Sequence, residues 1–131
     1  MKMMKWVLLL VMSIAYQTSA MAKDTYWTAH VGKDGTVLRQ WPKWIENVEL
    51  SANANYFSQY KLVFNNRIVH QDPGFCTVSP IDGSTEDRLL HGQAKVIGKP
   101  KAEGVTVLTQ LVDVKGASGD NSLEFLVMCM R

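Results

Sequence analysis

Several short stretches of this chain have the period-two pattern of an extended strand, and the last of them, in residues 121–131, is the most apolar. Successive side chains of an extended strand point to opposite faces, and from Leu126 onward both faces of this stretch are apolar. We therefore expect a strand that is buried on both faces rather than a loose tail. Leu123, Phe125, Val127 and Cys129 share one face, and the other face carries Glu124, Leu126, Met128 and Met130.

The same period of two returns between clusters of glycine, proline, asparagine and aspartate, which are typical of turns. No helical period persists for ten residues; residues 44–50 are expected to form a strand, although Trp44, Ile45 and Val48 also fit one helical turn. Many short strands without a convincing helix indicate an antiparallel sandwich or barrel. We predict an all-β fold, an antiparallel β-sandwich. The other expected strands are residues 24–31, 36–40, 56–64, 67–71, 75–79, 88–98 and 105–114.

The first 22 residues have the pattern of a secretory signal peptide. Lys2 and Lys5 precede an apolar run of about eleven residues, 6–16, and residues 20–22 (Ala-Met-Ala) form a small-x-small cleavage signature. The run is too short to cross a membrane. We expect an exported protein, periplasmic or extracellular, that begins near Lys23 and has no membrane span after cleavage; an uncleaved anchor is the alternative.

Removing residues 1–22 leaves 109 residues, 23–131, which is enough for a single domain with one core. The chain has 14 basic and 12 acidic residues, and two of the lysines leave with the signal, so we expect a mature protein without net charge. No basic stripe follows the expected strands. The charge pattern therefore does not indicate a nucleic acid as partner.

The two cysteines, Cys76 and Cys129, both lie in the expected mature protein. An even pair of cysteines in an oxidising compartment predicts a disulfide bond; two buried thiols are the alternative. A bond between them closes a loop of 53 residues. Such a bond stabilises a fold by about 4 kcal/mol on the chain-entropy account.

Residues typical of catalytic and metal sites are few. His30, His70 and His91 have no second histidine or carboxylate at the spacing of metal ligands, and there is no Gly-x-Ser-x-Gly motif. We expect a non-catalytic protein without metal or cofactor. An enzyme with two carboxylates flanking a cleft remains the alternative, because sequence does not show which acids approach one another.

Tryptophans give a more specific indication. Trp41 and Trp44 enclose a proline where the strand pattern is interrupted. Exposed indoles stack on sugar rings or anchor protein partners, so both are candidate ligand-binding residues. The alternative is that they close the end of the core.

The apolar outer residues of the last two expected strands need a cover, because each sheet of a two-layer sandwich normally has one face in water. A subunit interface would cover them, and so would loops or the N-terminal hairpin of the same chain. The residues concerned are Leu108, Val112, Val114, Leu126, Met128 and Met130.

Four short motifs follow one another between residues 44 and 131. They are Trp44-Ile45, Tyr60-Lys-Leu-Val-Phe64, Pro73-Gly-Phe-Cys76 and Phe125-Leu-Val-Met-Cys129. In this order they resemble the jelly-roll head modules of phage tail fibres and of C1q-like and tumour-necrosis-factor-like proteins. The resemblance implies a jelly-roll-like sandwich, a homotrimer, and binding to surface glycans or proteins.

These indications favour an exported, non-catalytic recognition module that binds a carbohydrate or a surface protein, as a monomer or a homotrimer. The alternative is a periplasmic inhibitor or immunity-type protein that blocks a partner enzyme with its loops. The candidate loop contacts are Asp82, Glu86, Asp87, Arg88 and the glycine-rich residues 115–120.

Overall fold

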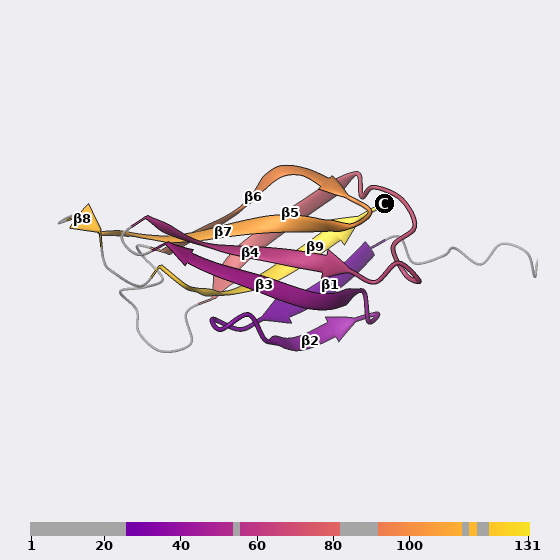
Figure 1. Cartoon of the computed structure of the whole chain (residues 1–131), viewed down its shortest axis with the longest axis horizontal. Coiled ribbons are helices and arrows are strands. Elements are labelled where there is room, and N and C mark those ends of the chain that lie inside the picture. Colours follow the sequence, from indigo (N-terminus) through magenta and orange to yellow (C-terminus); the bar gives the residue numbers. More distant parts are fainter. Residues whose placement is uncertain (1–25, 54–55, 82–91, 114–115, 118–120) are drawn as a thin grey trace, which may run out of the picture.

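The computed structural model describes residues 26–53, 56–81, 92–113, 116–117 and 121–131, which form two antiparallel sheets packed face to face (Figure 1). The first sheet has the strand order β2-β1-β9-β5, and the second has the order β3-β4-β7-β6, with β8 paired to β7. The predicted antiparallel β-sandwich is confirmed. The strands are β1 (Tyr26–Val31), β2 (Val37–Trp41), β3 (Ile45–Asn53), β4 (Phe57–Phe64), β5 (Phe75–Ile81), β6 (Gly92–Lys101), β7 (Gly104–Asp113), β8 (Gly116–Ala117) and β9 (Glu124–Met130).

The core lies between the sheets, where every second side chain of the central strands points inward. The ring centroids of Tyr60, from β4, and Phe125, from β9, are 5.0 Å apart in an edge-on arrangement, which joins the two layers. Burying such a side chain stabilises the fold by about 2 kcal/mol. The buried residues of this core cluster are Trp27, Ala29, Val31, Trp44, Ile45, Tyr60, Leu62, Phe64, Val69, Val105, Val107, Phe125, Val127 and Cys129.

Strand β9 is paired on both edges, to β1 and to β5, and is therefore a central strand of the first sheet. Only one of its faces is buried, however. Leu126 is 48% exposed and Met130 is 39% exposed on the outer side of the sheet. The expectation of burial on both faces is therefore wrong. An apolar face can pack against another element, but its apolar character does not show that such an element is present.

The predicted disulfide joins Cys76, in β5, to Cys129, in β9. The two residues are directly opposite each other in the antiparallel pair, with their Cα atoms 4.0 Å apart. Cys129 is fully buried, so the bond lies on the inner face of the first sheet. It connects the last strand to the middle of the chain, as the sequence predicts.

The returning strand expected at residues 67–71 does not form. The N–H groups of Ile68 and Val69 both donate to the carbonyl of Asn65, and the Asn65 side chain accepts a hydrogen bond from the N–H of Arg67 at 3.0 Å. These bonds wind the chain into a turn. A return beside β4 is also blocked, because β3 and β7 already occupy both of its edges.

Two other boundaries differ from the expected ones. Of residues 44–50, where a strand is expected, Ile45 to Leu50 belong to β3, in which Val48 pairs with Leu62 of β4, and Trp44 precedes the strand. Strand β6 continues past the expected end at Gly98 to Lys101 through an irregularity in its pairing. Gly98 has a φ of +75°, a conformation that glycine adopts without steric cost.

The turn between β1 and β2 matches the Gly-x-x-Gly signal at residues 32–35. The N–H of Gly32 donates to Thr36 at 2.7 Å, and Gly35 has a φ of +88°. The backbone N–H of Thr36 also donates to Asp34 Oδ1 at 3.0 Å. This bond to Thr36 lowers the pKa of the exposed Asp34 carboxyl.

Gly104 lies where β7 passes very close to β4. A Cβ atom added there would come within 2.3 Å of the backbone oxygen of Leu62, in the centre of the second sheet. We expect Gly104→Ala to destabilise the protein by roughly 2–3 kcal/mol, because main chain must move to admit the methyl group. Urea denaturation measures the loss.

The matched control for this prediction is Gly98→Ala. A Cβ at Gly98 has no neighbour within 4 Å, so the change is expected to cost only the strain of a positive φ, about 1 kcal/mol. Equal losses for the two variants would contradict the close approach at Gly104.

Candidate functional site

The outer face of the first sheet is built by cross-strand partners, which share one face of a sheet. Strand β9 lies between β5 and β1, and β2 lies beyond β1. The pairing therefore produces three rows across the sheet, each made from segments distant in sequence. They are Phe75, Met130 and Tyr26; Thr77, Met128, Thr28 and Trp41; and Ser79, Leu126, His30 and Arg39.

Exposed apolar side chains concentrate on this face. It holds five of the eight large apolar side chains that are exposed in the described part of the chain: Tyr26, Trp41, Phe75, Leu126 and Met130. Half-exposed side chains of this size present on the order of 100 Å² each, or roughly 500 Å² together. This is within the range of the largest apolar patch on a typical monomer, which is often functional.

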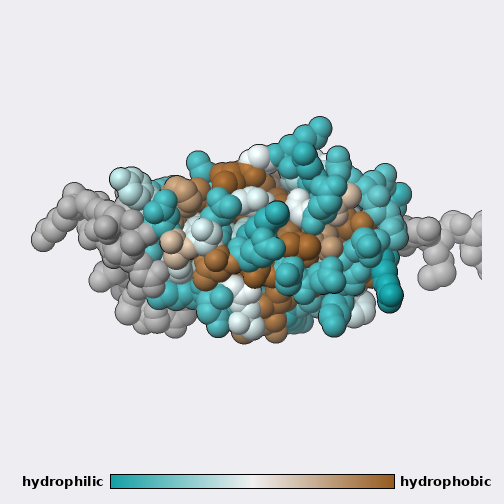
Figure 2. Space-filling view, viewed as in Figure 1, coloured by the Kyte–Doolittle hydropathy of each residue, from teal (hydrophilic) through white to brown (hydrophobic). Residues whose placement is uncertain are grey.

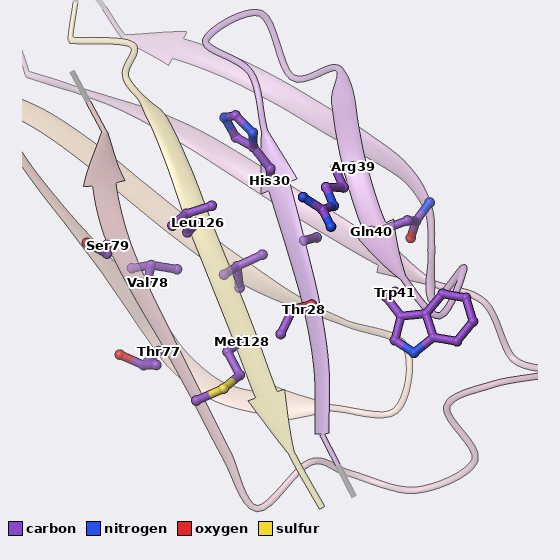
Figure 3. A pocket seen from close by; sticks show the side chains of 12 residues that line it. Thr28, His30, Arg39, Gln40, Trp41, Thr77, Val78, Ser79, Leu126 and Met128 are labelled. Atoms are coloured by element: carbon purple, nitrogen blue, oxygen red, sulfur yellow. The ribbon is translucent and has the colours of Figure 1, made fainter. Parts of the chain in front are cut away.

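A groove of about 450 Å³ crosses the middle of this face (Figure 3). Leu126 and Met128 of β9 lie beside Thr28 and His30 of β1, between the residues of β5 on one side and those of β2 on the other. The centre of the groove is thus mainly apolar. The residues that line it are Thr28, Ala29, His30, Arg39, Gln40, Trp41, Thr77, Val78, Ser79, Leu126, Val127 and Met128.

Gln40 holds the β2 side of the groove in place. Its side chain accepts a hydrogen bond from the N–H of Ile45 at 2.8 Å and donates to the Ile45 carbonyl at 3.3 Å. These bonds connect the edge strand of the first sheet to the start of β3 in the second. They position the outward-facing neighbours of Gln40, which are Arg39 and Trp41.

Two charged elements lie in or beside the groove. His30 Nε2 contacts Glu124 Oε1, and both side chains are more than two-thirds buried. The side chain of Arg39, the cross-strand partner of His30, has no hydrogen bond or ion pair with any described residue. The groove therefore combines an apolar centre with a cation that is free to pair.

The two candidate tryptophans lie on opposite sides of the first sheet. Trp41 is 69% exposed and lines the groove. Trp44 is fully buried, and its indole N–H donates to the Thr28 carbonyl at 2.9 Å. Its ring lies 6.1 Å from that of Trp27 and 5.2 Å from that of Phe64, between centroids.

Trp44 is therefore a core residue, and its assignment as a ligand contact is wrong. The chain turns between β2 and β3, where the Trp44 N–H donates to the Pro42 carbonyl, and this turn brings the second indole inward. The alternative, that a tryptophan closes the end of the core, holds for Trp44 but not for Trp41.

The outer face of the second sheet has a different character. Its cross-strand neighbours include Glu49 with Lys61, Lys61 with Thr106, and Lys95 with Leu108. Figure 2 views the molecule from the side where Figure 1 places β3, β4 and β7 in front, and shows hydrophilic residues over much of that face with hydrophobic ones between them. This is an ordinary solvated surface, so the apolar character of the first sheet is specific to one side.

No protein-family model matches the chain, and comparisons with curated proteins and with solved structures find no match either. The resemblance to jelly-roll head modules stays a prediction. The site must therefore be interpreted from its own chemistry.

Several expectations fall on parts of the chain outside the described residues. These are the signal peptide, the loop contacts Asp82, Glu86, Asp87 and Arg88, His91, and most of residues 115–120. The inhibitor hypothesis depends on those loops and stays a prediction. Of the outer residues expected on β7, Leu108 is partly buried, and the side chains of Val112 and Val114 are outside the described set.

Within the described ranges, no group of three or more histidine, cysteine, aspartate or glutamate side chains is placed to hold a metal ion. His70 lies on an exposed part of the chain. The same residues contain no helix long and apolar enough to cross a membrane.

Proposed function

We propose that this protein is an exported recognition module that binds another protein through the outer face of the β2-β1-β9-β5 sheet. The observation that carries the proposal is the concentration of exposed aromatic and large aliphatic side chains on this face, around a groove. The opposite face of the sandwich lacks such a concentration.

The composition of the face favours a protein over a carbohydrate. Protein interfaces are enriched in tryptophan, tyrosine, phenylalanine, methionine and arginine and are poor in lysine and glutamate. All five enriched types occur in the three rows, and lysine does not. A sugar needs hydrogen-bond partners beside a stacking ring. Leu126 and Met128 supply none at the centre of the groove.

Export is supported by the disulfide. Disulfides form and persist in oxidising compartments, and they are rare where cellular reductants keep thiols reduced. The bond between Cys76 and Cys129 therefore agrees with the signal-peptide pattern of residues 1–22.

A homotrimer would use the same surface. The outer residues of β9 and the exposed Trp41 share one face, since Met128, Thr28 and Trp41 lie in one row. A second copy that covered this face would also cover the ligand groove. Binding and self-association through the face are thus competing alternatives rather than two parts of one function.

Site-specific photo-cross-linking tests the proposal. A benzoyl-phenylalanine residue at Thr77, on the rim of the groove, is expected to give a defined adduct with a second protein in cells that export this one. The matched control places the same residue at Lys61, which is exposed on the outer face of the second sheet. The adduct should form from position 77 only, and it should disappear when Trp41→Ala is added.

Other results would count against the proposal. Equal adducts from both positions would mean nonspecific capture, and an adduct with the mass of two subunits would assign the face to self-association. Binding on a glycan array that Trp41→Ala abolishes would assign it to a carbohydrate.

A further inference from the structure

Arg39 is the cation of the groove that remains unpaired among the described residues. The other titratable group in the lining, His30, contacts the carboxylate of Glu124. The remaining lining residues are neutral. An occupant of the groove therefore meets one positive charge beside an apolar centre.

Covering this charge has a physical cost that limits what can bind. A guanidinium removed from water loses its hydration, and the loss is offset only when an acceptor replaces the water. Carboxylates match the fork of the guanidinium and form two parallel hydrogen bonds with it. A purely apolar occupant would leave Arg39 covered and unpaired.

From this charge complementarity we infer that the partner protein docks with a segment that carries an acidic residue next to an apolar one. The carboxylate pairs with Arg39, and the apolar side chain lies against Trp41, at the β2 side of the apolar centre formed by Leu126 and Met128. This inference rests on the proposed function and names the chemistry of the partner.

The spacing of the two partner residues follows from β2. Arg39 and Trp41 are two residues apart on one face of that strand. This places them about 6.6 Å apart along the strand. A partner segment matches that spacing with residues i and i+2 of a strand, or with residues i and i+4 on one side of a helix.

A second copy of this chain fits less well. Glu124 lies on the outer face of β9, one pair beyond the three rows, and His30 already contacts it. A symmetric pair would have to break that contact to reach Arg39. The charges thus favour a different protein.

Selection from a phage-displayed library of linear twelve-residue peptides tests the inference, with mature oxidised protein, residues 23–131, as the target. The selected peptides are expected to contain aspartate or glutamate two or four residues from an aromatic or large aliphatic residue. Selection on Arg39→Glu is expected to replace the acid by lysine or arginine and to keep the apolar residue.

The affinity of one selected peptide measures how much the Arg39 charge contributes to binding. Arg39→Gln is expected to weaken binding roughly ten- to hundredfold, as is typical for the loss of a hydrogen bond between charged groups. Replacing the peptide's acid by its amide should cause the same loss in the wild type and little further loss in Arg39→Gln. The matched control, Lys61→Gln, removes an exposed cation from the opposite face and should change the affinity less than twofold.

The outcomes separate this inference from the proposed function. If the selected peptides are apolar and still bind Arg39→Gln but no longer bind Leu126→Ser, the inference is overturned. The proposed binding face would stand. If the peptides bind Leu126→Ser and Trp41→Ala as well as the wild type, both the inference and the proposed function are overturned. The same holds if no peptide is enriched on protein shown to be folded. A light-scattering mass of two or three subunits that Leu126→Ser returns to one would overturn the inference in favour of self-association.

Discussion

Trp44→Ala is expected to lower the free energy of unfolding by about 3–5 kcal/mol, whereas Trp41→Ala is expected to change it by about 0.5 kcal/mol or less. Trp44 is fully buried and packs against Trp27 and Phe64, so its removal leaves a cavity and a Thr28 carbonyl without its donor. Trp41 has most of its surface in water and leaves no cavity. Guanidinium denaturation of both variants measures the difference.

The pair of tryptophans is its own control, since the two variants delete the same side chain three residues apart. The phage-selected peptides should respond in the opposite order, with binding lost in Trp41→Ala and kept in Trp44→Phe, which retains a ring in the core. Similar destabilisation by the two alanine variants would contradict the inward and outward assignment of the indoles.

Removing the disulfide is the second change with a large expected effect. The double variant Cys76→Ala/Cys129→Ala should lose about 4 kcal/mol of stability, because the unfolded chain regains the freedom of the open loop. Domains of this size are stable by about 5–15 kcal/mol in total. The melting temperature is therefore expected to fall on the order of 15 °C.

Calorimetry of the oxidised wild type, the reduced wild type and the double variant checks this prediction. Reduction alone should reproduce most of the loss, since it opens the same loop without changing the sequence. A double variant within about 1 kcal/mol of the oxidised protein would show that the bond contributes little, as occurs when the unfolded chain keeps structure of its own.

The strands and the disulfide could be predicted because local pattern determines them. The alternation along residues 56–64 indicates which face of β4 is buried. Two cysteines in a chain that is expected to be exported allow one disulfide pairing. Residues 67–71 show where this reasoning fails. Val69 is buried, as its apolar character suggests, but it reaches the core from a turn, and only the sheet order shows that β4 has no free edge.

The binding face could be predicted only in part, for a similar reason. The apolar outer residues of β9 and the exposed indole of Trp41 were both visible in the sequence, but as separate features. They lie in one row because of two strand pairings, that of β1 with its hairpin partner β2 and that of β1 with β9, which is distant in the chain. Arg39 and Thr77 gave no pattern at all, since a single polar residue on a strand is ordinary until its neighbours are known.

The disulfide also has a consequence for when the binding face becomes complete. Thr77 directly follows Cys76 in the chain, and Met128 directly precedes Cys129. Both line the groove, and they are cross-strand partners of each other. Oxidation thus holds together the two strands that carry one wall and the centre of the groove. A newly made chain lacks this restraint until it meets an oxidant, so, if the proposed function holds, the groove is fully braced only after the bond has formed.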